Sequence, residues 1–150
     1  MTWDEYFFGI ADAIAVKSHC LSRKIGAVAV RDGKFLVATG YNGPPIGYPH
    51  CAGKACPRRE LGFRSGQGLH ICPASHAERN VLIEAARLGT RLKDCTMYLT
   101  CSYPCRECAK EIVNAGIKEV VVTGGRDYPE DGLSGRQILG ICSVAVRIGR

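Results

Sequence analysis

The chain has 150 residues, of which 46% are hydrophobic and 23% are charged, and its formal net charge is +6. This balance fits a single domain over residues 1–150 with a core of its own and excludes a repeat or low-complexity protein. No run approaches the roughly 20 apolar residues of a membrane span, and the first eight residues lack the basic and long apolar regions of a secretory signal. We therefore expect a cytoplasmic protein without a membrane segment.

The first half of the chain combines a helical pattern, two strand patterns and an insert. Apolar residues repeat at helical spacing near residues 2 to 20 and predict an amphipathic helix. Two β-rich runs, 25–30 and 34–39, are joined by Asp32-Gly33, which is a strong hairpin signal. A Gly- and Pro-rich insert that carries cysteines then extends over about residues 42–72.

Helical and strand patterns alternate after the insert. One helix is predicted to begin at His76, and another at Cys105 with Pro104 in its first turn. The remaining predicted elements are a short helix over 134–139 and strands over 96–100, 118–123 and 143–148. Helices between strands imply parallel neighbours and hence a layered α/β fold.

Candidate zinc ligands stand at the starts of these two helices, in His76-Ala77-Glu78 and Pro104-Cys105-Arg106-Glu107-Cys108. Cys105 and Cys108 are three residues apart and fall on one helix face, where the positive helix end favours their thiolates. One imidazole and two thiolates fill three tetrahedral positions and leave the fourth for water, as in catalytic zinc sites. Glu78 is then free to take the water proton, deliver it to a ring nitrogen and later protonate departing ammonia, while hydroxide attacks an amidine-type carbon.

Each motif alone is also compatible with a plainer role. A Cys-x-x-Cys pair could be half of a structural zinc ribbon or a redox motif, and a lone His-x-Glu is close to chance. In this order, with Pro before the first Cys, the two motifs form the signature of zinc nucleobase deaminases. We therefore interpret His76, Cys105 and Cys108 as ligands of a catalytic zinc and Glu78 as the proton carrier.

The chain has nine cysteines, and this odd number in a cytoplasmic protein favours metal binding or free thiols. Seven lie outside the catalytic motif, and four of these are Cys20, Cys51, Cys56 and Cys72, of which three stand close to a histidine. We interpret them as ligands of a second, structural zinc that orders the insert, and leave open whether His50 or His70 replaces a cysteine. The alternative is that some are small buried residues. The other three fall in strand-like runs and are expected in the core: Cys95, Cys101 and Cys142.

Five segments also carry a family resemblance. They are Cys20 with Arg23-Lys24-Ile25-Gly26-Ala27, then Thr39-Gly40-Tyr41-Asn42-Gly43, the cysteine-bearing insert, His76-Ala77-Glu78-Arg79-Asn80 and Pro104-Cys105-Arg106-Glu107-Cys108-Ala109. From about residue 10 to residue 140 the chain resembles the deoxycytidylate (dCMP) deaminase family. The zinc motif is shared by the whole cytidine deaminase superfamily, whereas the Gly-Tyr-Asn-Gly segment and the insert narrow the resemblance.

The resemblance implies a three-layer α/β/α cytidine deaminase-like fold with a five-stranded mixed sheet. It implies hydrolysis of dCMP to dUMP and ammonia, which feeds thymidylate synthesis, by a homo-oligomer, commonly a hexamer, that dCTP and dTTP regulate in many members. It matches the insert cysteines to a second zinc site. It also matches the following residues to nucleotide contacts: Asn42 to the sugar, the backbone around Ala77 to the pyrimidine edge, Lys24 with Arg23 to the 5′-phosphate, and Tyr128 to a position beside the nucleotide.

Three of these residues are equally compatible with ordinary structural roles, and the chain departs from the family in two places. Arg23 and Lys24 could equally be solvated, and Asn42 could be a turn residue. The segment from Thr100 to Pro104 has one residue more than the family pattern, so Tyr103 either faces the base or packs. Arg79 replaces a residue that is often uncharged and is expected to face away from the metal.

Three other functions compete with dCMP deamination. The first is a dCTP deaminase or a bifunctional dCMP/dCTP enzyme. A tRNA adenosine deaminase would need a stripe of Lys and Arg that the sequence lacks, so we expect a small nucleotide substrate and no nucleic acid. The third is a non-catalytic zinc-stabilised binding module, and Glu78 argues against it because metal binding does not require that carboxylate.

Overall fold

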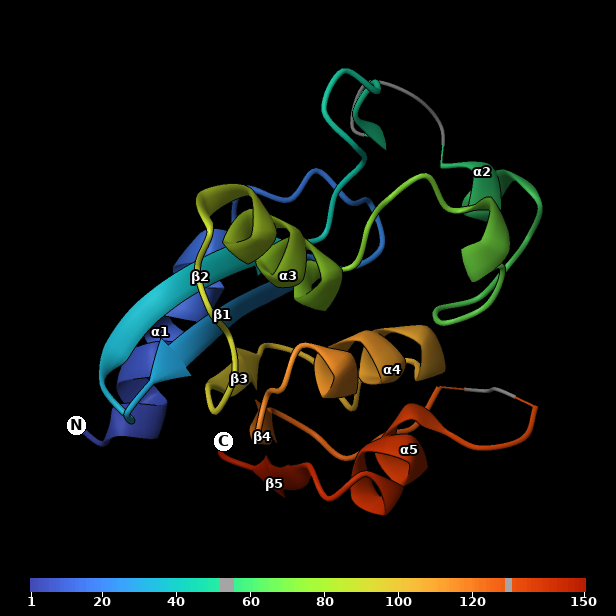
Figure 1. The fold of residues 1–150 in the computed structure, drawn as a ribbon. Coiled ribbons are helices and arrows are strands. Elements are labelled where there is room, and N and C mark those ends of the chain that lie inside the picture. Colours follow the sequence, from blue (N-terminus) through green and yellow to red (C-terminus); the bar gives the residue numbers. More distant parts are fainter. Residues whose placement is uncertain (52–55, 129–130) are drawn as a thin grey trace.

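The computed structural model describes residues 1–51, 56–128 and 131–150. A sheet lies between helices, and the insert extends away from it at the upper right of Figure 1. In chain order the elements are α1 (Trp3–Ala15), β1 (Gly26–Arg31), β2 (Phe35–Tyr41), α2 (Pro57–Glu60), the 3-10 helix η2 (Leu69–Ile71), α3 (Ala77–Leu88), β3 (Thr96–Leu99), α4 (Arg106–Asn114), β4 (Glu119–Val122), α5 (Gly135–Ile141) and β5 (Ala145–Ile148).

The strands form one mixed sheet of five in the order β2-β1-β3-β4-β5. β1 is antiparallel to β2 and β3, whereas β3, β4 and β5 are parallel. The parallel pairs are joined through α4 and α5, as parallel neighbours require a crossover. The predicted five-stranded mixed sheet is therefore confirmed.

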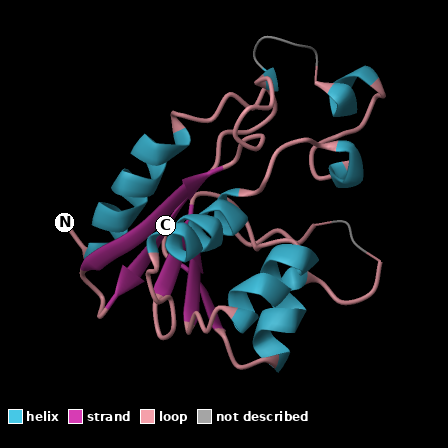
Figure 2. Cartoon of the chain, turned by 45° about the horizontal axis from the view of Figure 1, so that its top comes forward, coloured by secondary structure: helices cyan, strands magenta, loops and turns pink. Residues whose placement is uncertain are grey.

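Helices cover both faces of this sheet. On one face α1 packs on a core of aromatic and branched residues that includes Phe7, Phe8 and Val28. On the other face α3, α4 and α5 cover a larger core to which Ala27, Ala29 and other residues belong. Successive β1 residues thus point to opposite faces, as a strand buried on both sides requires. Figures 1 and 2 show α1 and the other helices on opposite sides of the sheet, which confirms the three layers.

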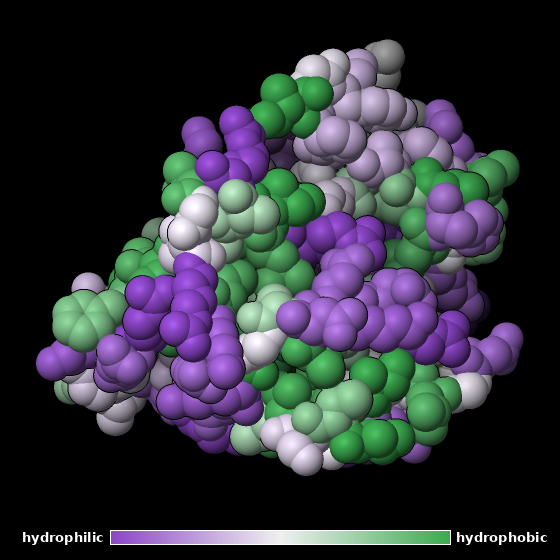
Figure 3. All heavy atoms as spheres, viewed as in Figure 1, coloured by the Kyte–Doolittle hydropathy of each residue, from purple (hydrophilic) through white to green (hydrophobic). Residues whose placement is uncertain are grey.

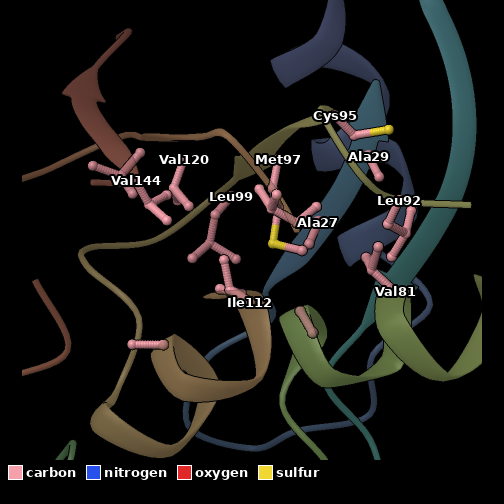
Figure 4. Close-up of a cluster of buried hydrophobic side chains, with 14 of the residues drawn as sticks. Ala27, Ala29, Val81, Leu92, Cys95, Met97, Leu99, Ile112, Val120 and Val144 are labelled. Carbon is pink, nitrogen blue, oxygen red and sulfur yellow. The ribbon is translucent and has the colours of Figure 1, made fainter. Parts of the chain in front are cut away.

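The larger core holds α3 and α4 against the strands. Val81 of α3 and Ile112 of α4 are fully buried and lie toward the β1 and β3 side chains, including Met97 and Leu99 (Figure 4). On its other side α4 is exposed, and Figure 3 shows hydrophilic residues over α4 and hydrophobic residues gathered over α5 in the view of Figure 1. This apolar core therefore holds α3 and α4, the helices at whose starts the predicted zinc ligands lie, against the sheet.

The predicted hairpin is present between β1 and β2. Asp32 and Gly33 both have positive φ, 51° and 70°, as the two central residues of a tight hairpin turn require. The ends of the insert are also paired, because Gly43 and Ser75 exchange two backbone hydrogen bonds of 3.1 and 2.8 Å. This bridge brings the chain back to the sheet directly before α3.

Three predictions on element ends and burial were wrong. The first helix ends at Ala15 and not near residue 20, because Ser18 turns into the fold and donates a 2.7 Å hydrogen bond to the Asn42 carbonyl. Pro104 precedes the N-cap of α4 instead of standing in its first turn. Cys142 is exposed because it ends α5 before the edge strand β5, whereas Cys95 and Cys101 are buried as predicted. Within the described residues, no helix is both long and apolar enough to cross a membrane.

Candidate functional site

His76, Cys105 and Cys108 meet where α3 and α4 begin. The His76 Nδ1 atom lies 3.5 Å from Cys105 Sγ and 3.4 Å from Cys108 Sγ. Among the described residues this is the one group of three or more candidate ligands whose atoms all lie within 4.8 Å of one another. The structure therefore brings the three sequence-predicted ligands together.

His76 and Cys105 are the N-cap residues of their helices. Both have extended backbone angles, and neither side chain forms the capping hydrogen bond that Ser, Thr or Asp would supply. Their side chains are therefore free to face each other. Helices usually have a capping side chain at this position. Departures from such local preferences are typical of functional residues.

Two glycines allow the backbone to come close at this point. A Cβ at Gly40 of β2 would overlap the Ala77 carbonyl oxygen, and one at Gly135 would overlap the Pro104 carbonyl oxygen. Gly40 thus lets α3 approach the sheet, and Gly135 lets α5 pack under the segment that carries Cys105.

The three residues fit a zinc ion. Zinc bonds of about 2.3 Å to sulfur and 2.0–2.1 Å to nitrogen at a tetrahedral angle place these atoms roughly 3.5 Å apart. The two observed nitrogen–sulfur separations, 3.5 and 3.4 Å, agree with this value. One nitrogen and two sulfurs also leave a fourth position for water.

The thiols and the imidazole influence one another's protonation. A hydrogen bond from Cys108 and then the neighbouring His76 lower the pKa of Cys105 to about 4, although burial opposes them. The same sulfur–sulfur hydrogen bond, together with burial, raises the pKa of Cys108. The hydrogen bond with Cys105 raises the pKa of His76. These contacts favour the thiolate of Cys105, which is the form that binds metal.

Glu78 stands beside this trio in the first turn of α3 and is only 3% exposed. Burial raises the pKa of its carboxyl group, and the nearby His76 charge lowers it to a smaller extent. A carboxyl group whose pKa lies nearer to neutrality both accepts and returns protons readily. The catalytic role of Glu78 stays a prediction, and its burial beside the predicted ligands is compatible with it.

A pocket adjoins His76 and Glu78. Its walls come from the loop before β1, the end of β2, the insert, the start of α3 and the loop after β4. The lining residues are Cys20, Ser22, Arg23, Ile25, Asn42, Arg58, Ser65, Gly66, Leu69, Cys72, Ala74, His76, Ala77, Glu78 and Tyr128.

Four of the predicted nucleotide contacts line this pocket, namely Arg23, Asn42, Ala77 and Tyr128. Asn42 is 8% exposed, accepts a 2.8 Å hydrogen bond from the Ile25 amide and donates one of 2.9 Å to the Arg23 carbonyl. Burial raises the pKa of Tyr128. The contacts of all four with a nucleotide stay predictions.

Lys24 differs from these four because it lies outside the pocket lining. Its predicted phosphate contact also stays a prediction.

Arg79 and Tyr103 have partners in the fold. Arg79 forms a two-point ion pair with Glu111, with separations of 2.9 and 2.8 Å, so it links α3 to α4. Tyr103 is buried with Arg136 over its ring at 5.0 Å, which makes it a packing residue. Cys101 is buried as well. The segment from Thr100 to Pro104, which is one residue longer than the family pattern, is therefore held by two buried side chains.

The sequence reasoning missed Arg58, Ser65 and Gly66 of the insert. Arg58 is only 9% exposed and donates hydrogen bonds to the carbonyls of Gln67 (2.6 Å) and Arg64 (3.1 Å). The sequence interpretation assigned the insert a role through its cysteines alone. In the sequence, the only feature that could mark Arg58 as a pocket residue is its charge. Arg59 beside it carries the same charge, so the sequence does not distinguish the two.

The predicted ligands of the second zinc are four thiols in and beside the insert. Burial first, then the charges of Cys56, Cys72 and Cys20, raise the pKa of Cys51. Among the described residues, no three of these sulfur atoms lie within 4.8 Å of one another, as the atoms of the catalytic trio do. The rings of His19 and His50 are 4.3 Å apart beside them.

Comparison with known proteins gives the same picture as the site. A family model described as the cytidine and deoxycytidylate deaminase zinc-binding region matches residues 1–124. Deoxycytidylate deaminase of Mycobacterium phage D29 is 43% identical over 134 residues, which cover 86% of this chain and 95% of the relative. Deoxycytidylate deaminase of Schizosaccharomyces pombe is 40% identical over 120 residues, and these cover 80% of this chain but only 36% of the relative.

Solved structures agree as well. The dCMP deaminase of cyanophage S-TIM5, in complex with dCMP and dUMP, superposes with a TM-score of 0.75 and 26% identity over 96% of this chain and 94% of the other. This likeness confirms the cytidine deaminase-like fold. Since the family model matches more than half of the chain, the chain belongs to the family of the cytidine and deoxycytidylate deaminase zinc-binding region.

Proposed function

We propose that this chain catalyses the hydrolytic deamination of dCMP to dUMP and ammonia. The observation that carries the proposal is the trio of His76, Cys105 and Cys108 beside the buried Glu78, where His76 and Glu78 line a pocket. The phage D29 relative, named deoxycytidylate deaminase and 95% covered by this chain, supports the substrate. A non-catalytic zinc module does not require a buried carboxyl group beside the metal ligands, so the position of Glu78 argues against this alternative.

Zinc held by His76, Cys105 and Cys108 would supply the Lewis acidity that makes a water easier to deprotonate. Glu78 takes one proton from the attacking water, whose oxygen bonds to C4 of cytosine, and delivers this proton to the adjacent ring nitrogen. Glu78 then moves the second water proton to the amino group. The bond between C4 and the amino nitrogen breaks with its electron pair on nitrogen, which leaves as ammonia, and the C4 carbonyl of uracil forms.

The substrate is tested by offering dCMP, dCTP, CMP, deoxycytidine and an adenosine-bearing RNA stem-loop separately. Ammonia release and loss of cytosine absorbance are the measurements. We expect the highest kcat/KM with dCMP. Turnover of dCTP alone would contradict the substrate and indicate a dCTP deaminase, and turnover of the RNA alone would indicate a tRNA deaminase.

We also propose that Cys20, Cys51, Cys56 and Cys72 hold a second zinc ion. Four thiolates complete a tetrahedral structural site, and the charges of the other three thiols act on Cys51. Zinc would draw the four sulfur atoms closer together than they lie in the structure. Cys20 and Cys72 also line the catalytic pocket, so this metal would fix the wall that the insert contributes. Oligomeric assembly, regulation by dCTP and dTTP, and a cytoplasmic location stay predictions.

A further inference from the structure

Arg58 is a buried cation in the wall of the pocket that faces the catalytic trio. It is 9% exposed although it belongs to the insert, most of which is at the surface. Its Nε and one Nη donate to the carbonyls of Gln67 and Arg64. A guanidinium group has five N–H donors, so these bonds fix its plane and leave donors for a ligand.

No carboxylate balances the charge of Arg58 within the part of the chain that the structure describes. The ion pairs there use other arginines and Lys110, and the one acidic residue that lines the same pocket is Glu78 at the catalytic end. Arg23 adds a second positive charge to the lining. A buried guanidinium without a counter-ion is costly, and an anionic ligand in the pocket removes this cost.

The lining around Arg58 suits a phosphate group in particular. Ser65 and Gly66 line the pocket in the loop that Arg58 holds through its flanking carbonyls. A hydroxyl group and a glycine backbone permit close approach of a phosphate, and arginine binds phosphate oxygens at two points. Lys24, in contrast, is exposed and lies outside this lining.

We propose that Arg58, together with Arg23, binds the 5′-phosphate of the substrate and thereby selects a nucleotide over a nucleoside. This inference rests on the proposed deamination at the same site. It gives the insert a role in substrate choice, separate from the chemistry at the trio.

The test compares ligands that differ only in the phosphate. Calorimetry measures the binding of dUMP and of deoxyuridine to the zinc-loaded protein, and kinetics give kcat/KM for dCMP and deoxycytidine. Arg58→Gln is expected to lower the preference for the phosphorylated ligand by about 10- to 150-fold, the effect of losing a charge-assisted hydrogen bond. The matched control is Arg59→Gln, which removes the same charge from the exposed neighbour on α2 and should leave the preference unchanged.

Arg58→Lys provides a second variant that keeps the charge but not the two-point contact, and it should retain part of the preference. Equal loss of dUMP and deoxyuridine affinity in Arg58→Gln at unchanged zinc content would overturn the proposal in favour of a purely structural role. An unchanged preference would overturn it as well. Failure of the proposed reaction is a different result: the wild-type protein would then turn over neither substrate, while the binding measurements would still test Arg58.

Discussion

The two walls of the pocket are built in different ways. The catalytic wall consists of the start of α3 with His76 and Glu78, and α3 lies on a sheet whose facing residues are buried. The insert wall has little apolar core and is closed by the bridge between Gly43 and Ser75, by the hydrogen bonds of Arg58 and, in our proposal, by a second zinc. Reacting groups therefore rest on a rigid scaffold, whereas substrate selection rests on a segment that needs polar and metal contacts to be ordered.

The largest expected effect concerns the chemistry of the catalytic wall. Glu78→Gln removes the proton carrier without removing a zinc ligand, so kcat should fall by roughly 10²- to 10⁴-fold, the usual contribution of a general acid–base group. Zinc content, measured by atomic absorption, should stay at the wild-type value. Glu60→Gln, at an exposed position of the insert, is the control and should leave kcat unchanged. An unaltered rate in Glu78→Gln would refute the mechanism.

The second prediction concerns the insert wall alone. Cys51→Ser should lower the zinc content from about two ions per chain to about one, because serine is a poor zinc ligand. Trypsin, which cleaves after arginine, should then cut faster at the exposed Arg59 of the insert, and kcat/KM for dCMP should fall.

Thermal unfolding of the sheet should change little in Cys51→Ser. Cys142→Ser, at the exposed end of α5, is the control and should keep both ions. If wild-type protein holds a single zinc ion, or if Cys51→Ser still holds two, the proposed ligand set is wrong.

The sequence predicts the catalytic wall better than the insert wall, because the first rests on apolar packing and the second on polar contacts. The hydrophobic periods of α3, α4 and the buried strands arise from packing on a sheet, so they are visible in the sequence, and so is the spacing of His76, Cys105 and Cys108. Arg58 has no such period, since its burial depends on carbonyls that only the folded loop presents. Likewise, the end of α1 depends on the distant contact of Ser18 with Asn42, and no local pattern encodes it.

The third prediction disturbs the scaffold under the trio. Gly135→Ala would place a methyl group against the backbone of Pro104 and Cys105, and overpacking of this kind costs about 1–3 kcal/mol of unfolding free energy. Zinc affinity, measured by competition with a chelator, should fall because Cys105 is displaced. Gly140→Ala is the matched control in the same helix, where nothing lies within 4 Å of the added carbon. It should stabilise α5 by roughly 0.5–1 kcal/mol. Equal behaviour of the two variants would contradict the close packing at Gly135.

The smallest effect is expected on the far face of the scaffold, where Asp4 of α1 accepts hydrogen bonds from Arg147 (2.5 and 2.9 Å) and from the Tyr98 hydroxyl (2.9 Å). The hydrogen bond from Arg147 lowers the pKa of Asp4. Because the folded-state pKa is the lower one, this stabilisation is complete above the unfolded-state pKa and is lost as the pH falls through the folded-state value.

Asp4→Asn should therefore lower the unfolding free energy at pH 7 by at most about 1 kcal/mol, since the pair is partly exposed to solvent. The difference between the variant and the wild type should shrink at acidic pH, because the unfolded chain then binds a proton at Asp4 more readily than the folded protein does. Urea unfolding at pH 7 and near pH 3 measures both quantities. A difference that is equally large at both pH values would mean that packing of Asp4, and not its charge, joins α1 to β5. The substitution should change neither zinc content nor kcat, because Asp4 and Arg147 lie on the opposite face of the sheet from α3 and α4.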